Sequence, residues 1–164
     1  NHDLWMKDYF EKELNISVHF NPEDFVFNNK KFFLGHGDGL GSKDTGYKLM
    51  KKIFTNKLAQ RAFRILHPDL GIRMGQYFSL RNKKNSSKKD STLIGVDNKS
   101  LSFYISEKLK QEHFDFFIFG HLHKPLEINL NSKSKYINLG DWISHFTYGS
   151  FDGTKLELKK WKIK

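Results

Sequence analysis

The hydrophobic pattern near the start of the chain consists of short apolar runs separated by polar turns. Residues 8–14 predict a short helix, and the apolar runs at 25–27 and 31–34 predict two strands. The asparagine pair at 28–29 indicates a hairpin turn between them. Because the second strand runs directly into the Gly-rich segment 35–39, we expect a rigid turn at its end.

A helical period replaces this pattern in the middle of the chain. Apolar residues recur three and four positions apart between Tyr47 and Leu66, which predicts helix up to a break at residues 67–69. A further helix is predicted over residues 70–78, followed by a polar, basic and mobile segment over residues 82–92. We interpret this region as a helical insertion with an apolar side and a basic side. Such helices lie on a membrane interface, cover an amphipathic ligand or pack on their own domain.

Strands dominate the remainder of the chain. Residues 101–111 predict a helix, and residues 114–119 predict a buried strand that ends at the motif Gly-His-Leu-His. Three further strands are predicted at residues 126–130, 136–139 and 155–163. The sequence therefore predicts a single domain of mixed α/β (α+β) class over residues 1–164, with histidines at strand ends.

Length and composition limit the class of protein. A chain of 164 residues is long enough to bury a core. The longest apolar run is far shorter than the roughly 18 residues of a membrane span, and the first residues lack the features of a signal peptide. We therefore expect neither a span nor a signal peptide. The absence of Cys excludes disulfides and thiolate metal sites, and it is typical of a reducing cytosol.

The chain carries a formal net charge of +10, and the excess is confined to one segment. Residues 43–89 contain thirteen Lys and Arg but only two acidic residues, Asp44 and Asp69, whereas the remainder is close to neutral. Such a segment attracts phosphate groups, an anionic membrane surface or nucleic acid. A solvated helical face is the alternative that the charges leave open.

Two histidines separated by one residue form the strongest chemical signal. His121 and His123 can both reach one site only if a turn holds them, and the flanking Gly120 and Pro125 favour a turn. Neutral imidazole favours Zn, Mn or Fe as the metal. A third histidine, His36, follows another predicted strand in the same way. The sequence therefore predicts a metal site built at strand ends.

The first three residues combine an amide, an imidazole and a carboxylate. Asn1 offers a neutral oxygen ligand, and His2 can donate a proton or a hydrogen bond to a phosphate oxygen. Asp3 can orient that imidazole from behind. The histidines without a motif are interpreted as solvated or packed, and these are His19, His67, His113 and His145.

Three short motifs, at residues 1–3, 35–38 and 120–123, resemble the last three metal motifs of the calcineurin-like metallophosphoesterases, in the same order. Two earlier motifs of that family, Asp-x-His and Gly-Asp-x-x-Asp, are absent from the chain. The resemblance implies the C-terminal portion of a metallophosphoesterase β-sandwich flanked by helices. It also implies a helical cap inserted at about residues 43–92.

The resemblance further implies a binuclear metal centre. The residues that match ligand positions are Asn1, His36 and His121 for one ion and His123 for the other. The implied cofactors are two divalent ions, preferably Mn²⁺, with Fe or Zn as alternatives. The carboxylates that join the ions would lie upstream of Asn1. His2 matches the residue that stabilises the transition state or protonates the leaving group, with Asp3 behind it.

Within the family, the chain most resembles the hydrolases that cleave the pyrophosphate of UDP-2,3-diacylglucosamine in lipid A synthesis. Segment 36–40 is followed by Asp44 and by an insertion whose basic and apolar character resembles the cap that holds the acyl chains. Residues 86–97 resemble the return of that cap, where a Lys contacts the substrate phosphate. The substrate-binding residues implied are Asp44, Arg81, Lys88 and Lys89. One difference is His2, where many of these hydrolases have Arg.

The implied reaction is two-metal hydrolysis that releases UMP and 2,3-diacylglucosamine 1-phosphate. The implied enzyme acts on a nucleotide-linked lipid, and it is cytoplasmic and peripheral on the anionic inner membrane, without a nucleic acid partner. Asn138 and Trp142 lie in a segment that resembles the family's closing strand and loop, and we assign them structural roles. One alternative is a metallophosphoesterase for another nucleotide or phosphodiester, without an acyl-chain pocket. The other is a non-catalytic basic module that binds membrane or nucleic acid through residues 43–89.

Overall fold

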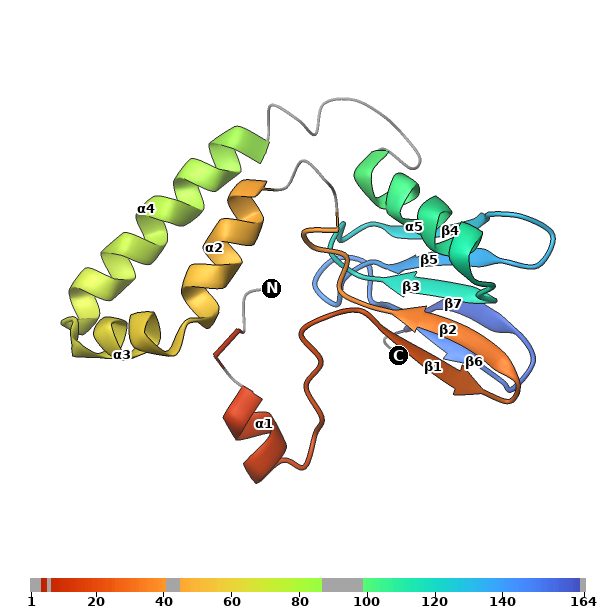
Figure 1. Ribbon diagram of the computed structural model, residues 1–164, viewed down its shortest axis with the longest axis horizontal. Helices are drawn as coiled ribbons and strands as arrows, with labels where there is room; N and C mark the ends of the chain where they lie inside the picture. The colour runs from red at the N-terminus through yellow and green to blue at the C-terminus, as the bar shows by residue number, and fades with distance from the viewer. Residues whose placement is uncertain (1–3, 6, 41–44, 87–98, 163–164) are drawn as a thin grey trace. The chain divides into compact units, whose positions relative to one another are not determined.

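Two units make up the chain in its computed structural model (Figure 1). The structure describes residues 4–5, 7–40, 45–86 and 99–162. Residues 1–42 and 100–164 form the core unit, and residues 43–99 form the insertion.

A five-stranded sheet organises the core unit. Its strands, in spatial order, are β1 (Glu23–Phe27), β2 (Lys30–Leu34), β3 (Phe116–Phe119), β5 (Lys135–Leu139) and β4 (Pro125–Asn129). The other elements of the unit are α1 (Lys7–Glu13), α5 (Lys99–Gln111), β6 (Thr147–Phe151) and β7 (Leu156–Lys160). β1 and β2 form the predicted hairpin, and both turn residues, Asn28 and Asn29, have positive φ. Asparagine tolerates this backbone conformation, so the turn could be predicted.

The three central strands run parallel, which places their carboxyl ends at one edge of the sheet. β2 pairs with β3, and β3 pairs with β5, both in parallel register. Gly35, Gly120 and Gly140 follow these strands directly, so three loops begin at the same edge. The carboxyl ends of parallel strands are a common place for a binding site. Strand order therefore brings motifs together that lie far apart in the sequence.

Each face of the sheet has its own core, because successive strand residues point to opposite faces. On one face, α5 packs Leu101 and Ile105 against a buried cluster that includes Phe117. On the other face, the small sheet of β6 and β7 brings Leu156 onto Ile137. The core unit thus has three layers, with α5 on one side of the main sheet and β6–β7 on the other (Figure 1).

The described residues of the insertion form three helices, and these are α2 (Thr45–Thr55), α3 (Lys57–Ile65) and α4 (Pro68–Ser86). The prediction of continuous helix to Leu66 is wrong at Asn56, which separates α2 from α3. The Asn56 side chain accepts hydrogen bonds from the backbone of Leu58 and Ala59, and this N-cap starts a new helix. Residues 82–86, the start of the segment predicted to be polar, basic and mobile, form the last part of α4, which ends at Ser86. Residues 87–92 lie outside the described part of the chain.

One strand is missing from the sequence prediction, and two others are shorter than predicted. β6 was not predicted, because Gly149 and Ser150 interrupt its apolar pattern. The strand predicted at 155–163 is observed as β7, and the strand predicted at 114–119 begins only at Phe116. The predicted mixed α/β fold, a sheet flanked by helices, is confirmed. Within the described residues, no helix is both long and apolar enough to cross a membrane.

Candidate metal and substrate site

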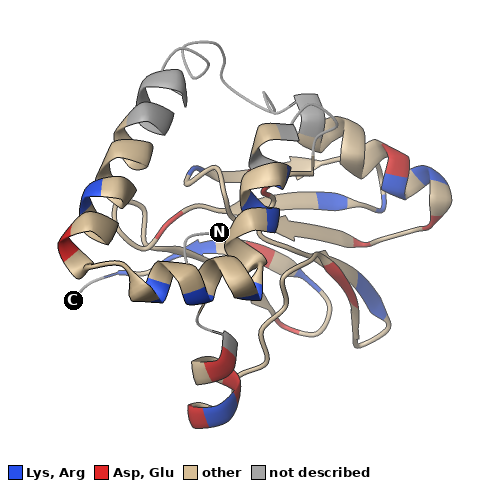
Figure 2. Cartoon of the chain, turned by 60° about the vertical axis from the view of Figure 1, so that its left-hand side comes forward, with Lys and Arg blue, Asp and Glu red and all other residues tan. Residues whose placement is uncertain are grey.

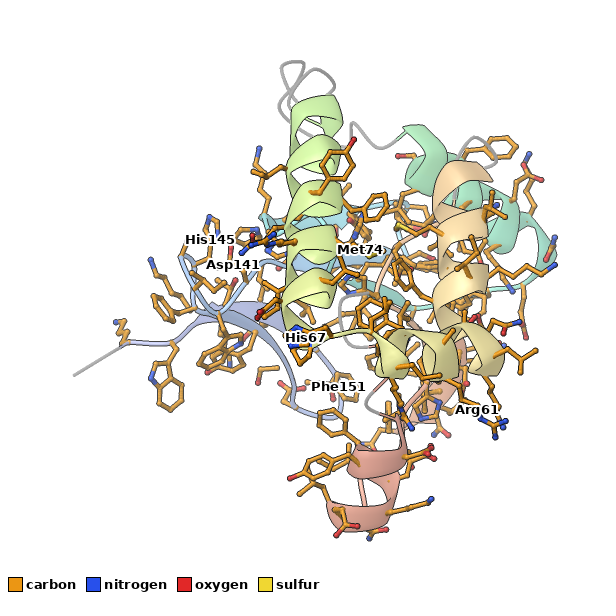
Figure 3. The ribbon with its side chains drawn as sticks, turned by 90° about the vertical axis from the view of Figure 1, so that its left-hand side faces the viewer. Arg61, His67, Met74, Asp141, His145 and Phe151 are labelled. Carbon is orange, nitrogen blue, oxygen red and sulfur yellow. The ribbon has the colours of Figure 1, made fainter. Side chains whose placement is uncertain are left out.

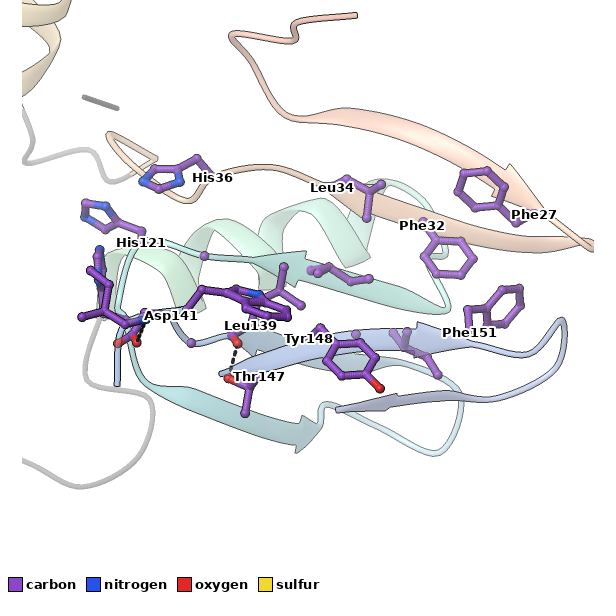
Figure 4. Close-up of a pocket in the computed structure, with 18 residues that line it drawn as sticks. Phe27, Phe32, Leu34, His36, His121, Leu139, Asp141, Thr147, Tyr148 and Phe151 are labelled. Atoms are coloured by element: carbon purple, nitrogen blue, oxygen red, sulfur yellow. Dashed lines mark hydrogen bonds between the residues drawn. The ribbon is translucent and has the colours of Figure 1, made fainter. Parts of the chain in front are cut away.

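His36 and His121 come together at the shared edge of the sheet, after β2 and β3 (Figure 4). Their ring centroids lie 5.3 Å apart, with the ring planes at 76° to each other. The backbone N–H of Gly120 donates to the His36 carbonyl at 3.0 Å, which ties the two loops together. The parallel pairing therefore continues past the strand ends and holds one imidazole beside the other.

The Gly-His-Leu-His motif forms the predicted turn, between β3 and β4. His121 and His123 both have positive φ, at 39° and 52°. Residues other than Gly rarely adopt this conformation, which costs about 1–3 kcal/mol each and persists only where the surroundings impose it. Such positions are frequent at functional sites. The exposed His123 lines the same cleft as His36 and His121.

Asn138 fastens this turn to the loop that follows β5. Its side chain is completely buried, and its amide nitrogen donates to the carbonyl of Gly120, directly before His121. Its amide oxygen accepts a hydrogen bond from the backbone N–H of Gly140 at 3.2 Å. One buried side chain thus joins the loops after β3 and β5. The structural role of Asn138 is to hold the backbone beside the histidine pair.

The surroundings of His36 favour its neutral form. Loss of solvent around the ring is the main cause, and it lowers the pKa of the imidazole from 6.5 to about 4. Positive charge on His121 and His123 also lowers this pKa, whereas Asp38 raises it. Neutral imidazole is the form that binds a metal ion, so His36 is ready to act as a ligand at neutral pH.

We expect His36 to make the metal-free protein less stable as the pH falls below about 6.5. The unfolded chain takes up a proton near that pH, while the folded protein resists protonation down to about 4. Acid therefore favours the unfolded state within this window. His36→Asn should flatten the fall of the unfolding temperature between these pH values, whereas His19→Asn, at an exposed histidine of the core unit, should not. An equal slope for His36→Asn and the unaltered protein would refute the expectation.

The described residues fit part of a metal site. Within them, no group of three His, Cys, Asp or Glu side chains lies close enough to hold an ion. His36 and His121 nevertheless present neighbouring imidazoles of the chemistry that Mn, Fe and Zn accept. Further ligands would have to come from outside the described residues, where the predicted ligand Asn1 also lies.

Asp141 and His145 form a pair beside the site that the sequence reasoning missed (Figure 3). The Asp141 carboxylate accepts hydrogen bonds from the backbone of Ile143, Ser144 and His145, and it lies 3.1 Å from Nδ1 of His145. These bonds, that of Ser144 above all, hold the pKa of Asp141 far below its usual range. The charged carboxylate fixes the loop after β5. An Asp and a His four residues apart, directly after a strand and a glycine, are the signal that could have found the pair.

A cleft of about 840 Å³ extends from the histidines along the sheet (Figure 4). His36 and His121 stand at one end, and Phe27 and Phe151 stand at the other. The walls between them are apolar and include Leu34. The small sheet reaches the inner faces of β2 and β3 through Phe151 of β6, whose ring centroid lies 5.0 Å from that of Phe32 and 5.9 Å from that of Phe116. Its polar end suits a phosphate group, and its length suits an apolar extension.

The structure brings the predicted ligands His36 and His121 together, and the predicted ligand His123 lines the same cleft. The other predicted site residues lie outside the described part of the chain, and these are Asn1, His2, Asp3, Asp44, Lys88 and Lys89. Arg81 lies in α4, but its side chain is outside the described part. The roles predicted for these residues therefore stay predictions.

Comparison with known proteins identifies relatives along nearly the whole chain. No protein-family profile matches it. It is 30% identical, over 97% of its length, to the UDP-2,3-diacylglucosamine hydrolase of Porphyromonas gingivalis, and it covers 65% of that protein. The hydrolase of the same name from Proteus mirabilis is 23% identical over 96% of the chain, which covers 65% of it. A third, from Yersinia pestis, is 27% identical over 76% of the chain, which covers 50% of it.

The chain thus spans at most about two thirds of the length of these relatives. Their shared name agrees with the resemblance that the histidine motifs and the insertion predicted. The first of them matches both the segment that carries His36 and the segment that carries His121 and His123, because the match covers 97% of the chain. The resemblance predicted from the sequence is therefore confirmed: the chain is similar, along nearly its whole length, to proteins named UDP-2,3-diacylglucosamine hydrolase.

Proposed function

We propose that the chain is part of a metal-dependent pyrophosphatase that hydrolyses UDP-2,3-diacylglucosamine to UMP and 2,3-diacylglucosamine 1-phosphate in lipid A biosynthesis. The observation that carries this proposal is the meeting of His36 and His121 at the ends of neighbouring parallel strands. It is supported by the relatives, whose names specify hydrolysis of that lipid-linked nucleotide.

Two divalent ions, preferably Mn²⁺, would be the cofactors. His36, His121 and Asn1 would hold one ion and His123 the other, with further ligands from outside the described residues. When bound, such ions lower the pKa of a bound water and neutralise charge on the phosphate. Fe and Zn accept the same imidazole ligands, so they are the alternatives.

The chain's own residues prepare the site for this chemistry. The left-handed turn at residues 121–123 and the buried Asn138 orient the imidazoles before any ion binds. Because the pKa of His36 is lowered to about 4, a proton does not compete with a metal ion for its imidazole at neutral pH. We further propose that His2, oriented by Asp3, donates a proton or hydrogen bond to the phosphate or the leaving group.

The insertion would bind the lipid part of the substrate. Apolar side chains on all three helices are exposed, among them Ile53, Leu58 and Tyr77. Lys and Arg are spread along α2 and α3, and Asp69 is the one acidic residue in the described part of the insertion (Figure 2). Figure 3 shows both kinds, with Arg61 projecting from α3 and Met74 from α4. Apolar and basic groups on one small unit suit acyl chains and phosphates.

In this proposal Asp44, Arg81, Lys88 and Lys89 contact the substrate. The enzyme would work in the cytoplasm, peripheral on the inner membrane, because its substrate carries acyl chains. Basic residues of the insertion would attract the anionic membrane surface.

The full-length protein should release UMP from UDP-2,3-diacylglucosamine when Mn²⁺ is present, and EDTA should abolish the release. UDP-glucose has the same pyrophosphate but no acyl chains, so it should be cleaved at least about 100-fold less efficiently if the acyl chains supply binding energy. The measurement is UMP formation by chromatography at equal substrate concentrations. Equal cleavage of the two substrates would disprove the lipid assignment, and turnover in EDTA would disprove the metal.

A further inference from the structure

Three aromatic rings gather at the rim of the core unit, beside the end of the cleft that holds the histidines. Trp142 comes from the loop after β5, Tyr148 from β6, and Trp161 from the residues directly after β7. The ring centroid of Trp142 lies 6.3 Å from that of Trp161 and 6.4 Å from that of Tyr148. The centroids of Tyr148 and Trp161 are also 6.4 Å apart. We call these three residues, with the neighbouring Ile143, the aromatic patch.

The aromatic patch is exposed although its backbone is firmly held. Trp142 is 58% exposed, Ile143 81% and Trp161 54%. The Asp141 carboxylate fixes the loop by accepting the backbone N–H of Ile143 at 2.9 Å, and the N–H of Trp161 donates to the Phe146 carbonyl at 2.7 Å. Single exposed apolar residues are ordinary, but several large ones gathered on a rigid rim mark a surface that contacts a partner, a membrane or another part of the protein.

Basic side chains adjoin the aromatic patch. Lys159 lies opposite Tyr148 in the register of β6 and β7, and Lys160 and Lys162 flank Trp161 in the chain. Glu157, the one acidic residue between positions 156 and 162, lies 3.5 Å from the Lys159 ammonium, so Lys160 and Lys162 carry the excess positive charge of this segment. Tryptophan beside lysine is the composition of protein surfaces at the boundary between water and an anionic bilayer, where the rings enter the headgroup layer and the ammonium groups meet lipid phosphates.

We propose that the aromatic patch docks on the surface of an anionic phospholipid bilayer. Trp142, Ile143 and Tyr148 also line the cleft, so a lipid-linked substrate could pass from the bilayer to the histidines without crossing water. In this one respect the proposal rests on the proposed function. Charge complementarity with Lys160 and Lys162 selects an anionic surface. This surface belongs to the core unit and is distinct from the apolar helices of the insertion.

Tryptophan fluorescence can test the docking directly. The chain contains three Trp, so Trp5→Phe leaves only Trp142 and Trp161, and any Trp elsewhere in the full-length protein is replaced by Phe as well. Vesicles of phosphatidylcholine with about 30% phosphatidylglycerol, brominated on their acyl chains, should quench this emission, because bromine quenches only rings that reach it. Binding to these vesicles without loss of emission would overturn the proposal, since another surface would then hold the bilayer.

The second test uses variants that reverse a charge or remove an aromatic ring. Their affinity for unbrominated vesicles is measured by sedimentation. Lys160→Glu with Lys162→Glu should lower the affinity for the anionic vesicles at least about 10-fold, and the matched pair Lys12→Glu with Lys133→Glu should not. Trp161→Ser should weaken binding, whereas Phe103→Ser, at a residue 61% exposed on α5, should not. Equal losses in the matched variants, or equal affinity for vesicles of phosphatidylcholine alone, would overturn the proposal.

Activity separates this proposal from the proposed function. Trp161 does not line the cleft, so Trp161→Ser with the two charge reversals should leave UMP release from detergent-dispersed substrate unchanged. The same variant should lose activity on substrate embedded in anionic vesicles. Loss of activity in detergent as well would overturn the docking proposal. An unaltered protein that binds vesicles through the aromatic patch but releases no UMP would refute the proposed function alone.

Discussion

His121→Ala should reduce UMP release by the Mn²⁺-loaded full-length protein at least about 100-fold, since loss of even an outer partner of a metal ligand typically costs 10–100-fold. His121 stands beside His36 at the end of β3 and is not part of the buried core, so its ring can be removed without opening a cavity. The bound metal, measured by elemental analysis after dialysis, should fall with the activity. The unfolding temperature of the metal-free variant should stay close to that of the unaltered protein.

His19→Ala is the matched control for this variant. His19 is exposed, and its Nδ1 lies 2.7 Å from Glu23 in an exposed pair that contributes little to stability. Its loss should leave metal content and UMP release unchanged. If His121→Ala keeps its turnover and its metal content, the histidine pair does not bind the metal. The proposed function would then lose its main supporting observation.

Local signals in the sequence were sufficient for most elements. The hairpin turn at Asn28 and Asn29 follows from the backbone preference of asparagine. Helices α1 and α5 follow from apolar spacing alone. The errors arise where tertiary packing decides. Gly149 breaks the apolar pattern of β6, yet a Cβ at this position would lie 3.3 Å from a methyl group of Leu139, so close packing against β5 favours glycine in this strand.

The candidate site was only partly visible in the sequence, for a reason of topology. Periodicity identifies strands but not their spatial order, so the motifs of His36 and His121 could be paired only through a family resemblance. The parallel order β2-β3-β5 brings a third loop to the same edge, and that loop carries Asp141 and His145. Gly140 begins it with a φ of 77°, a conformation that most other residues avoid. Because the sequence does not reveal the strand order, no sequence pattern predicted that this loop lies beside the histidines.

Asn138→Leu should weaken Mn²⁺ binding about 10–100-fold although Asn138 is not a predicted ligand. Leucine has the same branched outline but bulkier methyl groups and no polar atoms, so the N–H of Gly140 loses its partner and the carbonyl of Gly120 keeps only the N–H of Leu122. An unpaired buried group costs about 1–3 kcal/mol and overpacking of a filled site about 1–3 kcal/mol, so the free energy of unfolding in urea should fall by at least about 2 kcal/mol. The turn that holds His121 in its left-handed conformation would lose the bond directly before it.

Asn131→Leu separates this positioning effect from a general loss of stability. Asn131 also accepts two backbone hydrogen bonds, from Lys133 and Ser134, but it is exposed and lies at the turn between β4 and β5. Water can replace its side chain, so the loss of stability should be smaller and Mn²⁺ affinity should not change. Metal titrations at a temperature where both variants are fully folded decide the matter. If Asn138→Leu binds Mn²⁺ as tightly as Asn131→Leu, the bond between Gly120 and His36 holds the turn without help from Asn138.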